Sequence, residues 1–446
     1  MMVVMCDHGT MQNELERHTR SVVSERLADG SMVELVYIPE HRRTALARWS
    51  VNGDLTIEDR LVFQGETLVP ISAANNLIRH AAVLLPSVPL EFGDEAALMR
   101  DIRAFIHRYV DLTDTFEAIA SHYVLLSWVY DAFNELPYLR FQGDYGTGKT
   151  RALLIIGAIT YKPFFASGAS TVSPIFHTLN AFSGTLIFDE ADFRMSDEKA
   201  ELTKILNNGN VRGMPVLRTI INNKHEFNPA AFNVFGPKIV ATRGVYEDRA
   251  LESRFITEIM TGRRLRKDIP INLSDDWREE ALGLRNKLLM YRFRNRGKVR
   301  LDPGQVDPML EPRLNQVLVP LLSVIADKTV RLDVLERAGA MQQTMVFDRG
   351  LSIEADILES LTSLISDTSR KVITIKAIAD VVAGQHPGEF ARPITPKYVG
   401  SLLRRRLNIA VYKSNGSYVV PVSEWPKIKE LCRRYGIDTE APSPVS

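Results

Sequence analysis

Eight residues near the middle of the chain could hold the phosphates of a nucleotide. Residues 143–150 read Gly-Asp-Tyr-Gly-Thr-Gly-Lys-Thr, which fits the pattern G-x-x-x-x-G-K-[ST] in full. Glycines let successive backbone N–H groups turn toward phosphate oxygens. Lys149 would reach the β- and γ-phosphates of ATP, and the Thr150 hydroxyl would bind Mg²⁺. The predicted phosphate loop comprises Gly143, Asp144, Tyr145, Gly146, Thr147, Gly148, Lys149 and Thr150.

Two carboxylates downstream could complete this chemistry. Residues 185–188 are apolar or β-branched and are followed by Asp189 and Glu190, which is typical of a buried parallel strand whose end faces a nucleotide. We expect Asp189 to complete the Mg²⁺ site and Glu190 to orient and deprotonate the attacking water. Residues 189–192 read Asp-Glu-Ala-Asp, but the chain is too short for the two motor lobes of a DEAD-box protein.

The elements around these residues predict an α/β core. An apolar strand at 138–141 precedes the phosphate loop and a helical apolar run at 152–159 follows it, and this strand–loop–helix context distinguishes the loop from a chance glycine-rich turn. Helical periodicity at 95–134 leads into the strand. Strands and helices then alternate to about residue 262, which favours a mostly parallel sheet. We therefore assign residues 93–265 to a nucleotide-binding core.

Three further residues could act on the γ-phosphate. Thr242 ends the strand 238–242 and would help to place the water, or else cap its own turn. Arg254 would stabilise charge on the transferring phosphoryl group from a neighbouring subunit; Arg249 is an alternative, and a salt bridge within the chain would leave Arg254 a structural role. Arg313 opens a helix and would either contact the γ-phosphate from a lid or face solvent.

A predicted β-hairpin could contact nucleic acid. Residues 216–221 and 226–235 would form its strands around a basic tip. At this tip Lys224 could bind phosphate as a point charge, and His225 could hydrogen-bond sugar or phosphate. An exposed polar turn is the alternative. Arg212 and Arg218 suit either a subunit interface or a central pore.

The last ninety residues have the order of a winged-helix domain, which we place at 350–440. A helix at 373–382, a second helix from Thr395-Pro396 to Leu407, a hairpin around Asn415-Gly416 and a final helix from about 423 to 435 follow one another. The second helix carries residues suited to the major groove of DNA, although a solvated charged face or a protein-binding surface would also explain them. These residues are Lys397, Tyr398, Arg404, Arg405 and Arg406.

Composition and the remaining segments narrow the class of protein. The chain has 446 residues and a net charge of +1, so any binding of nucleic acid must come from local patches. Two distant cysteines provide no disulfide framework, which favours a cytoplasmic protein. No apolar run approaches the roughly 20 residues of a membrane span. We expect a leader at 1–30, a small β-rich module at 31–92 and a helical lid and connector at 266–345.

Together these segments resemble AAA+ ATPases of the helix-2-insert and pre-sensor-hairpin branch, which includes superfamily 3 viral helicases and MCM-type helicases. The chain is more closely similar to ATPase–winged-helix proteins of prophages, plasmids and integrative elements. The resemblance covers roughly residues 95–440 and rests on the segments 139–150, 185–190, 206–218, 235–238 and 251–255. The adjacent Lys224 and His225 are similar to the hairpin tip of papillomavirus-type replicative helicases.

The resemblance implies a hexamer that hydrolyses ATP with Mg²⁺ at its subunit interfaces and moves single-stranded DNA through its pore during replication of a mobile element. The winged helix would bind duplex DNA or a partner protein. The ninety N-terminal residues have no room for a primase, so a separate primase or initiator protein would act with the chain. They also lack the Cys-rich zinc module of many MCM proteins. Three alternatives remain: an AAA+ initiator or loader, a DNA-binding regulator switched by nucleotide and, more distantly, a protein-remodelling ATPase.

Overall fold

The structure is a computed structural model in which the chain forms two compact units, Met1–Leu335 and Glu336–Ser446. It describes residues 19–189, 197–221, 227–246, 248–262, 265–350, 352–366, 372–385, 394–414 and 416–437. None of the helices within these ranges is long and apolar enough to cross a bilayer.

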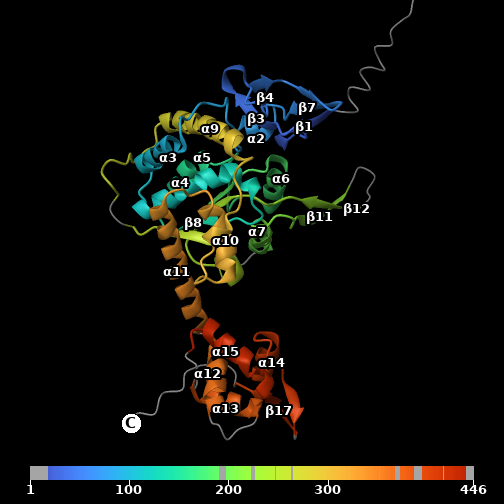
Figure 1. Cartoon of the computed structure of the whole chain (residues 1–446), viewed down its shortest axis with the longest axis vertical. Helices are drawn as coiled ribbons and strands as arrows, with labels where there is room; N and C mark the ends of the chain where they lie inside the picture. The colour runs from blue at the N-terminus through green and yellow to red at the C-terminus, as the bar shows by residue number, and fades with distance from the viewer. Residues whose placement is uncertain are drawn as a thin grey trace, which may run out of the picture. The chain divides into compact units, whose positions relative to one another are not determined.

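A five-stranded parallel sheet forms the centre of the first unit (Figure 1). Its order is β14-β8-β13-β10-β9, so β13 lies between the strand that precedes the phosphate loop and the acidic strand. This confirms the predicted α/β class with a mostly parallel sheet. The strands are β8 (Tyr138–Gln142), β9 (Phe164–Ser167), β10 (Leu186–Asp189), β13 (Lys238–Thr242) and β14 (Phe255–Ile259).

Helices cover both faces of this sheet, because successive side chains of a strand point to opposite faces. Phe188 and Val240 pack in one apolar cluster with side chains of α6 (Val172–Phe182) and α7 (Asp197–Asn208). On the other face, α5 (Lys149–Ala158) approaches so closely that a Cβ on Gly157 would lie 2.9 Å from Ile187 Cγ1. Helices α3 (Glu95–Tyr109), α4 (Asp114–Val129) and α9 (Asp276–Asn295) pack against one another on this side, and α3 and α9 also contact α5.

The amino-terminal strands form two small sheets that belong to the same unit as the core. Strands lie within the segment 31–92 but begin earlier, at Thr19, inside the predicted leader. Leu35 of the longest hairpin packs in the same apolar cluster as the central sheet. One sheet has the order β1-β7-β6 and the other β2-β3-β4-β5. The elements are β1 (Thr19–Val22), β2 (Ser24–Arg26), β3 (Met32–Ile38), β4 (Arg43–Trp49), β5 (Leu55–Glu58), β6 (Leu61–Phe63), β7 (Glu66–Pro70) and the short α2 (Asn76–Arg79).

A buried charge network joins β3 to the core and to α9. Glu34 is 1 % exposed and accepts from Lys162 Nζ at 2.7 Å and from Arg292 Nε at 2.6 Å. Arg292 also pairs with Asp131 at 2.9 Å. Burial by itself would raise the pKa of Glu34, but the two cations outweigh it and lower that pKa. Burial lowers the pKa of Lys162 to about 8, so the Lys162 ammonium depends on the Glu34 carboxylate.

A second buried lysine begins β13 at the amino edge of the sheet. Lys238 Nζ donates to the carbonyl oxygens of Val234 at 2.9 Å, Gly236 at 3.0 Å and Gly209 at 3.2 Å. Burial, reinforced by the charge of Arg254, lowers the pKa of Lys238 to about 7. Carbonyl dipoles, rather than a carboxylate, therefore solvate this amine.

The second unit contains a helical bundle with a three-stranded antiparallel sheet of order β15-β17-β16. The prediction of a helix from residue 373 was wrong at its start, because Ile373 and Thr374 pair with β17 and α13 begins at Ile375. The elements are α12 (Ile353–Ser366), β15 (Ile373–Thr374), α13 (Ile375–Gln385), α14 (Pro396–Arg405), β16 (Tyr412–Ser414), β17 (Ser417–Val420) and α15 (Trp425–Arg434). Helices α10 (Pro312–Leu322) and α11 (Lys328–Gly350) precede them in the sequence.

Candidate nucleotide-binding site

The glycine-rich loop connects β8 to the first turn of α5, as a phosphate cradle requires. Gly146 and Gly148 have φ values of +71° and +92°, which side chains with a Cβ rarely adopt. Gly148 is the N-cap of α5, and Lys149 is its first residue. The unpaired N–H groups and positive dipole end of this helix therefore face the loop, where they favour an anion.

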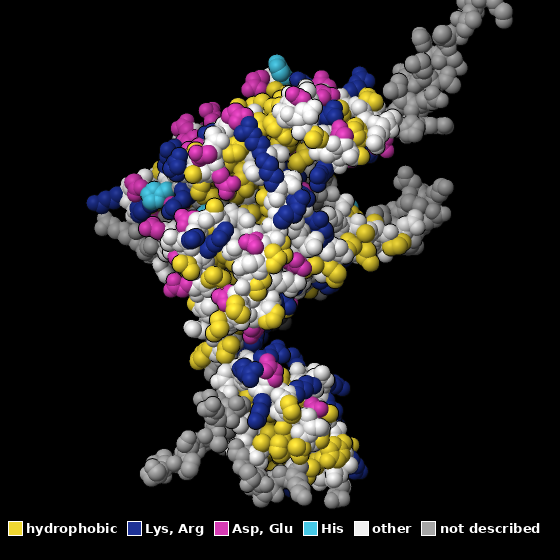
Figure 2. Space-filling model, viewed as in Figure 1, with side chains coloured by type: hydrophobic (Ala, Val, Ile, Leu, Met, Phe, Trp, Pro, Cys, Tyr) yellow, Lys and Arg dark blue, Asp and Glu magenta, His cyan; other side chains and the backbone are white. Residues whose placement is uncertain are grey.

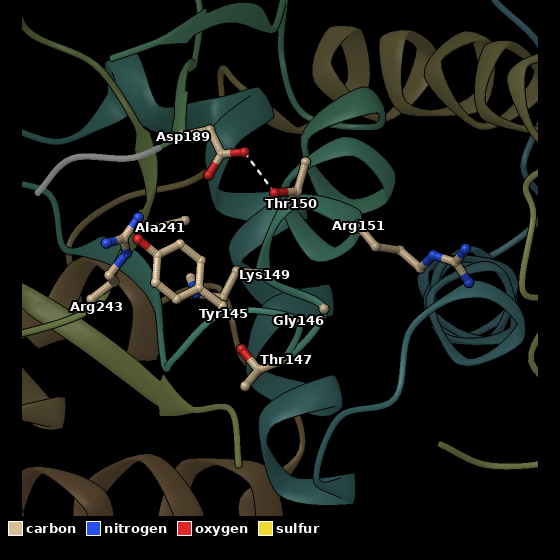
Figure 3. Close-up of a pocket in the computed structure, with 10 residues that line it drawn as sticks. Tyr145, Gly146, Thr147, Lys149, Thr150, Arg151, Asp189, Ala241 and Arg243 are labelled. Carbon is tan, nitrogen blue, oxygen red and sulfur yellow. Dashed lines mark hydrogen bonds between the residues drawn. The ribbon is translucent and has the colours of Figure 1, made fainter. Parts of the chain in front are cut away.

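Thr150 and Asp189 meet at the carboxyl edge of the sheet. The Thr150 hydroxyl donates to Asp189 Oδ2 at 2.7 Å (Figure 3). Thr150 lies in α5, which follows β8, and Asp189 ends β10. β13 separates these two strands in the sheet, and the fold brings the two side chains together. A hydroxyl and a carboxylate are oxygen ligands of the kind that Mg²⁺ prefers beside substrate phosphates. The pair thus fits the Mg²⁺ ion of an ATP complex.

Lys149 lies in the same cavity and is held by the loop itself. Its Nζ donates to the carbonyl oxygens of Gly143 at 2.7 Å and Asp144 at 2.6 Å. A phosphate would replace these neutral carbonyl acceptors, because an anionic acceptor attracts the ammonium more strongly. The cavity has a volume of about 360 Å³, within the range of ligand sites. Its lining residues are Tyr145, Gly146, Thr147, Gly148, Lys149, Thr150, Arg151, Asp189, Ala241 and Arg243.

Two residues at the end of β13 line this cavity, and the residue between them does not. Ala241 and Arg243 line it, whereas Thr242, between them, is 1 % exposed and follows Val240 on the opposite face of the strand. Thr242 Oγ1 has no hydrogen-bond partner among the described residues. A role of Thr242 in placing water stays a prediction. The sequence analysis missed Arg243, although its position directly after the strand could have indicated it.

The two arginines of the cavity differ in how they are held. Arg151 donates to the carbonyl oxygens of Pro270 and Ile271 and points away from the loop (Figure 3). The Arg243 guanidinium instead lies over the ring of Tyr145, 3.7 Å from its centroid. Arg151 therefore fixes the segment that follows β14, while Arg243 faces the cavity beside Lys149.

The predicted catalytic arginines lie around the short helix α8 (Arg249–Glu252), at the opposite edge of the sheet. The Arg254 carbonyl accepts from Tyr138 N at 2.8 Å, at the amino end of β8, and its guanidinium contacts the Asn207 side chain. Burial and the nearby charge of Arg313 lower the pKa of Arg254, although Tyr138 opposes this shift. Within one chain, Arg254 thus lies away from the phosphate loop.

Arg313 also lies at this amino edge, away from the position that the sequence suggested. It donates to Ser253 Oγ at 2.6 Å and to the Ala250 carbonyl at 2.7 Å. It does not line the cavity described above. The structure therefore does not place Arg313 against the γ-phosphate of its own chain, because α10 packs its amino end on α8 and not over the loop.

The predicted hairpin is present as β11 (Val216–Ile221) and β12 (Phe227–Phe232). Arg218 at its base pairs with Glu201 and lies over the Phe176 ring, 5.2 Å from its centroid. Arg212 donates to the Asp131 carbonyl at 2.6 Å. Hydrophobic side chains are exposed along the hairpin (Figure 2), and Leu217 is 67 % exposed.

Three residues of the predicted machinery lie outside the described ranges: Glu190, Lys224 and His225. Their roles stay predictions. The described part of the hairpin establishes only that α6 and α7 hold its base and that its strands project from there.

The basic residues of α14 lie on its exposed side. Thr395 Oγ1 accepts from Tyr398 N, which confirms the predicted N-cap, and Val399 and Leu403 are buried in the core of the second unit. The helical period therefore leaves the opposite face to solvent. The exposed residues include Lys397, Tyr398, Arg404, Arg405 and Arg406.

Comparisons with known proteins add distant structural likenesses. No family model and no curated protein matches the chain. A structure described as the NrS-1 C-terminal region has a TM-score of 0.37 at 11 % identity and covers 87 % of this chain and 96 % of its own. The SCCmec type IV Cch active helicase has a TM-score of 0.39 at 11 % identity, and the match covers 91 % of this chain and 97 % of its own.

The ORC1 protein of Aeropyrum pernix in complex with DNA has a TM-score of 0.21 at 13 % identity, covering 73 % of this chain and 94 % of its own. The described site itself, a glycine-rich loop between a strand and a helix of a parallel α/β sheet, has the fold of a P-loop ATPase core.

Proposed function

We propose that this protein is an ATP-dependent DNA helicase or translocase of a mobile genetic element that acts as a ring oligomer, a hexamer, on single-stranded DNA. The observation that carries the ATPase part is the 2.7 Å hydrogen bond between Thr150 and Asp189 beside the glycine-rich loop. A hydroxyl on the phosphate-loop helix and a carboxylate on the next-but-one strand form the magnesium site that phosphoryl transfer needs.

In this proposal each chain binds ATP through its own phosphate loop, and residues of a neighbouring subunit complete the site. Lys149 exchanges the Gly143 and Asp144 carbonyls for β- and γ-phosphate oxygens. Thr150 and Asp189 would hold Mg²⁺, which would supply positive charge to these phosphates. Glu190 takes the proton of the attacking water, and Thr242 supports its position.

The neighbouring subunit supplies the arginines that lie around α8. Arg254 is the proposed finger. Arg313 and Arg249 are beside it in sequence or in space, so the same surface could present more than one cation to the partner's γ-phosphate. In this arrangement Arg313 would act on the nucleotide bound by the neighbouring subunit and not on the nucleotide of its own chain.

Two surfaces would contact DNA. The β11–β12 hairpin is held at its base by α6 and α7, which suits an arm that moves with the ATPase core and carries Lys224 and His225 along a strand. The exposed basic face of α14 suits the phosphates or the major groove of a duplex. A separate primase or initiator protein would supply priming and origin recognition.

An AAA+ initiator or loader is the second candidate. The exposed face of α14 favours it, because this surface could hold duplex DNA without any translocation. A regulator that only switches its DNA affinity with nucleotide would use the same face. Both alternatives predict DNA binding that survives replacement of Lys224 and His225.

Strand displacement on forked DNA tests the proposal. Wild type, Glu190→Gln and Lys149→Ala would be compared on duplexes with 3′ or 5′ tails, with ATP and Mg²⁺. Displacement by wild type alone is the expected result, and the preferred tail gives the polarity. Wild-type protein that binds the fork and hydrolyses ATP without displacing a strand would instead identify the loader.

A further inference from the structure

Two arginines from distant parts of the first unit meet on one carbonyl oxygen. Arg212 Nη2 and Arg296 Nη2 each donate to the carbonyl oxygen of Asp131 at 2.6 Å. The two nitrogens therefore lie within twice that distance of each other. A carbonyl oxygen can accept from two donors, but its partial charge does not balance two guanidinium charges. The pair therefore attracts an anion.

The carboxylates behind these arginines are already paired. The Asp131 carboxylate lies 2.9 Å from Arg292 Nη1 and 2.7 Å from Arg296 Nε. The connected set has more cations than carboxylates: Lys162, Arg212, Arg292 and Arg296 against Glu34 and Asp131. Lys162 and Arg292 are buried, whereas Arg212 is exposed. The excess of positive charge thus reaches solvent at Arg212 and the partly exposed Arg296.

The backbone holds Arg212 in place beside the hairpin. Leu136 N donates to the Asn210 carbonyl at 2.9 Å, and Arg212 N donates to the Asn134 carbonyl at 2.8 Å. The Arg212 guanidinium also lies 5.3 Å from the centroid of the Phe235 ring. Strand β11 begins shortly after Arg212. Arg212 is thus fixed at the amino edge of the central sheet, at the base of the β11–β12 hairpin.

The carboxyl end of α9 extends the basic surface. Residues 292–300 read Arg-Phe-Arg-Asn-Arg-Gly-Lys-Val-Arg, and Lys298 and Arg300 are exposed. Cations near the carboxyl end of a helix stabilise its dipole, which accounts for basic residues in this run. The dipole does not account for Arg212, because this arginine comes from the segment between α7 and β11.

We propose that Arg212 and Arg296 together bind one phosphate group of a single-stranded DNA backbone, with Lys298 and Arg300 adding to the positive potential around it. A phosphate oxygen would replace the Asp131 carbonyl as the acceptor that both guanidiniums share, because an anionic acceptor attracts them more strongly. A protein segment rich in carboxylates offers the same charge, but the position at the base of the proposed DNA-binding hairpin favours DNA. The inference rests on the proposed function and adds to it a DNA contact outside the hairpin tip and α14.

Fluorescence anisotropy of a labelled oligothymidylate strand with the full-length chain, at a series of salt concentrations, tests the proposal. Arg212→Gln and Arg296→Gln should each weaken binding by about tenfold, the size expected for a lost charge-assisted hydrogen bond. Each should also lower the magnitude of the slope of log K against log salt by about 0.7, the value for one phosphate of a single strand. Because the two arginines share one phosphate, the double variant should lose little more than either single variant.

Control variants separate phosphate binding from a loss of structure. Arg278→Gln removes an exposed arginine at the amino end of the same helix, and should leave affinity and slope unchanged. Arg212→Lys keeps the charge and should keep most of the slope. Thermal unfolding midpoints would identify any variant that fails to fold. Arg212→Gln tests the site even if Arg296→Gln unfolds, because the Arg212 side chain is exposed.

The outcomes distinguish this site from the proposed function. Wild-type protein that binds no single strand would overturn the proposed DNA-binding function together with the site. Wild-type protein that binds the strand, with an Arg212→Gln variant of unchanged affinity and slope, would overturn the site alone. Additive losses in the double variant would refute the shared phosphate. A polyglutamate peptide that binds wild type more tightly than oligothymidylate, and binds Arg212→Gln less tightly, would identify an acidic protein segment as the ligand and overturn the assignment to DNA.

Discussion

Mixing two inactive variants, Arg254→Ala and Glu190→Gln, should restore ATP hydrolysis. The five residues of β8, with about 3.3 Å between neighbours, place its two end residues roughly 13 Å apart. Arg254 lies at the amino end of this strand and the Thr150–Asp189 pair lies beyond its carboxyl end. An arginine at that distance cannot reach the γ-phosphate of its own chain, so the site needs the arginine of a neighbour.

The expected size of the recovery follows from this geometry. Each variant alone should lose about a thousandfold or more in kcat, as arginine fingers do. In an equal mixture, a subunit that keeps Glu190 stands beside one that keeps Arg254 at about one interface in four. The mixture should therefore hydrolyse ATP at about a quarter of the wild-type rate.

The assay is steady-state ATP hydrolysis with single-stranded DNA at a series of mixing ratios and constant total protein. Activity should be greatest at equal amounts and fall toward either pure variant. Arg278→Ala is a matched control, because the described side-chain contacts of this exposed arginine are with its near neighbours Asp275 and Trp277. An Arg254→Ala variant with wild-type activity, or a mixed oligomer with no recovery at any ratio, would refute the assignment of Arg254 to the neighbouring site.

Three further predictions concern stability and DNA binding. Glu34→Leu should cost about 3–5 kcal/mol in the free energy of urea unfolding, because it strands the buried Lys162 ammonium, and adding Lys162→Met should recover most of it; equal losses in the single and double variants would contradict this. Because the pKa of Lys238 falls from 10.5 to about 7 on folding, its contribution to stability is greatest above pH 10.5 and is lost as the pH falls to 7. Between pH 7 and 9 the free energy of unfolding of wild type should therefore rise, relative to that of Lys238→Met, by up to about 1.4 kcal/mol per pH unit. If the unfolding free energies of the two proteins changed in parallel with pH, the pKa of Lys238 would not be shifted. Replacing both Arg404 and Arg405 by Gln should lower the slope of log K against log salt for duplex DNA by about 2, if both contact phosphates; an unchanged slope would remove α14 from the DNA interface.

The sequence predicted the local parts of the site because each lies within one strand–loop–helix unit. The pattern of residues 143–150 predicts a loop followed by a helix. Because Asp189 ends an apolar strand, its carboxylate is expected at the carboxyl edge of the parallel sheet. The prediction that a parallel sheet joins them required only the alternation of strands and helices. The structure adds that β13 lies between the two strands.

The parts that the sequence did not predict depend on packing between distant segments. Which side of β13 faces the cavity decides whether residue 242 or 243 lines it, and an apolar strand buried on both faces gives no sign of this. Arg313 lies in the first turn of α10, whose contacts with α8 appear only in the folded chain. Glu34 reads as an ordinary polar position, yet its partners are 128 and 258 residues away.

The charge network around Glu34 limits how the protein can be divided. A fragment that begins at residue 93, where the pattern of helices and strands predicted the start of the core, would lose Glu34 while keeping Lys162 and Arg292. Two cations now buried in the folded chain would lose their shared carboxylate, and the apolar surface around Leu35 would be opened to water. Such a fragment should be insoluble or aggregate on expression. The smallest tractable ATPase fragment should therefore begin before β1, and natural relatives that change one of the three charges should change the others with it.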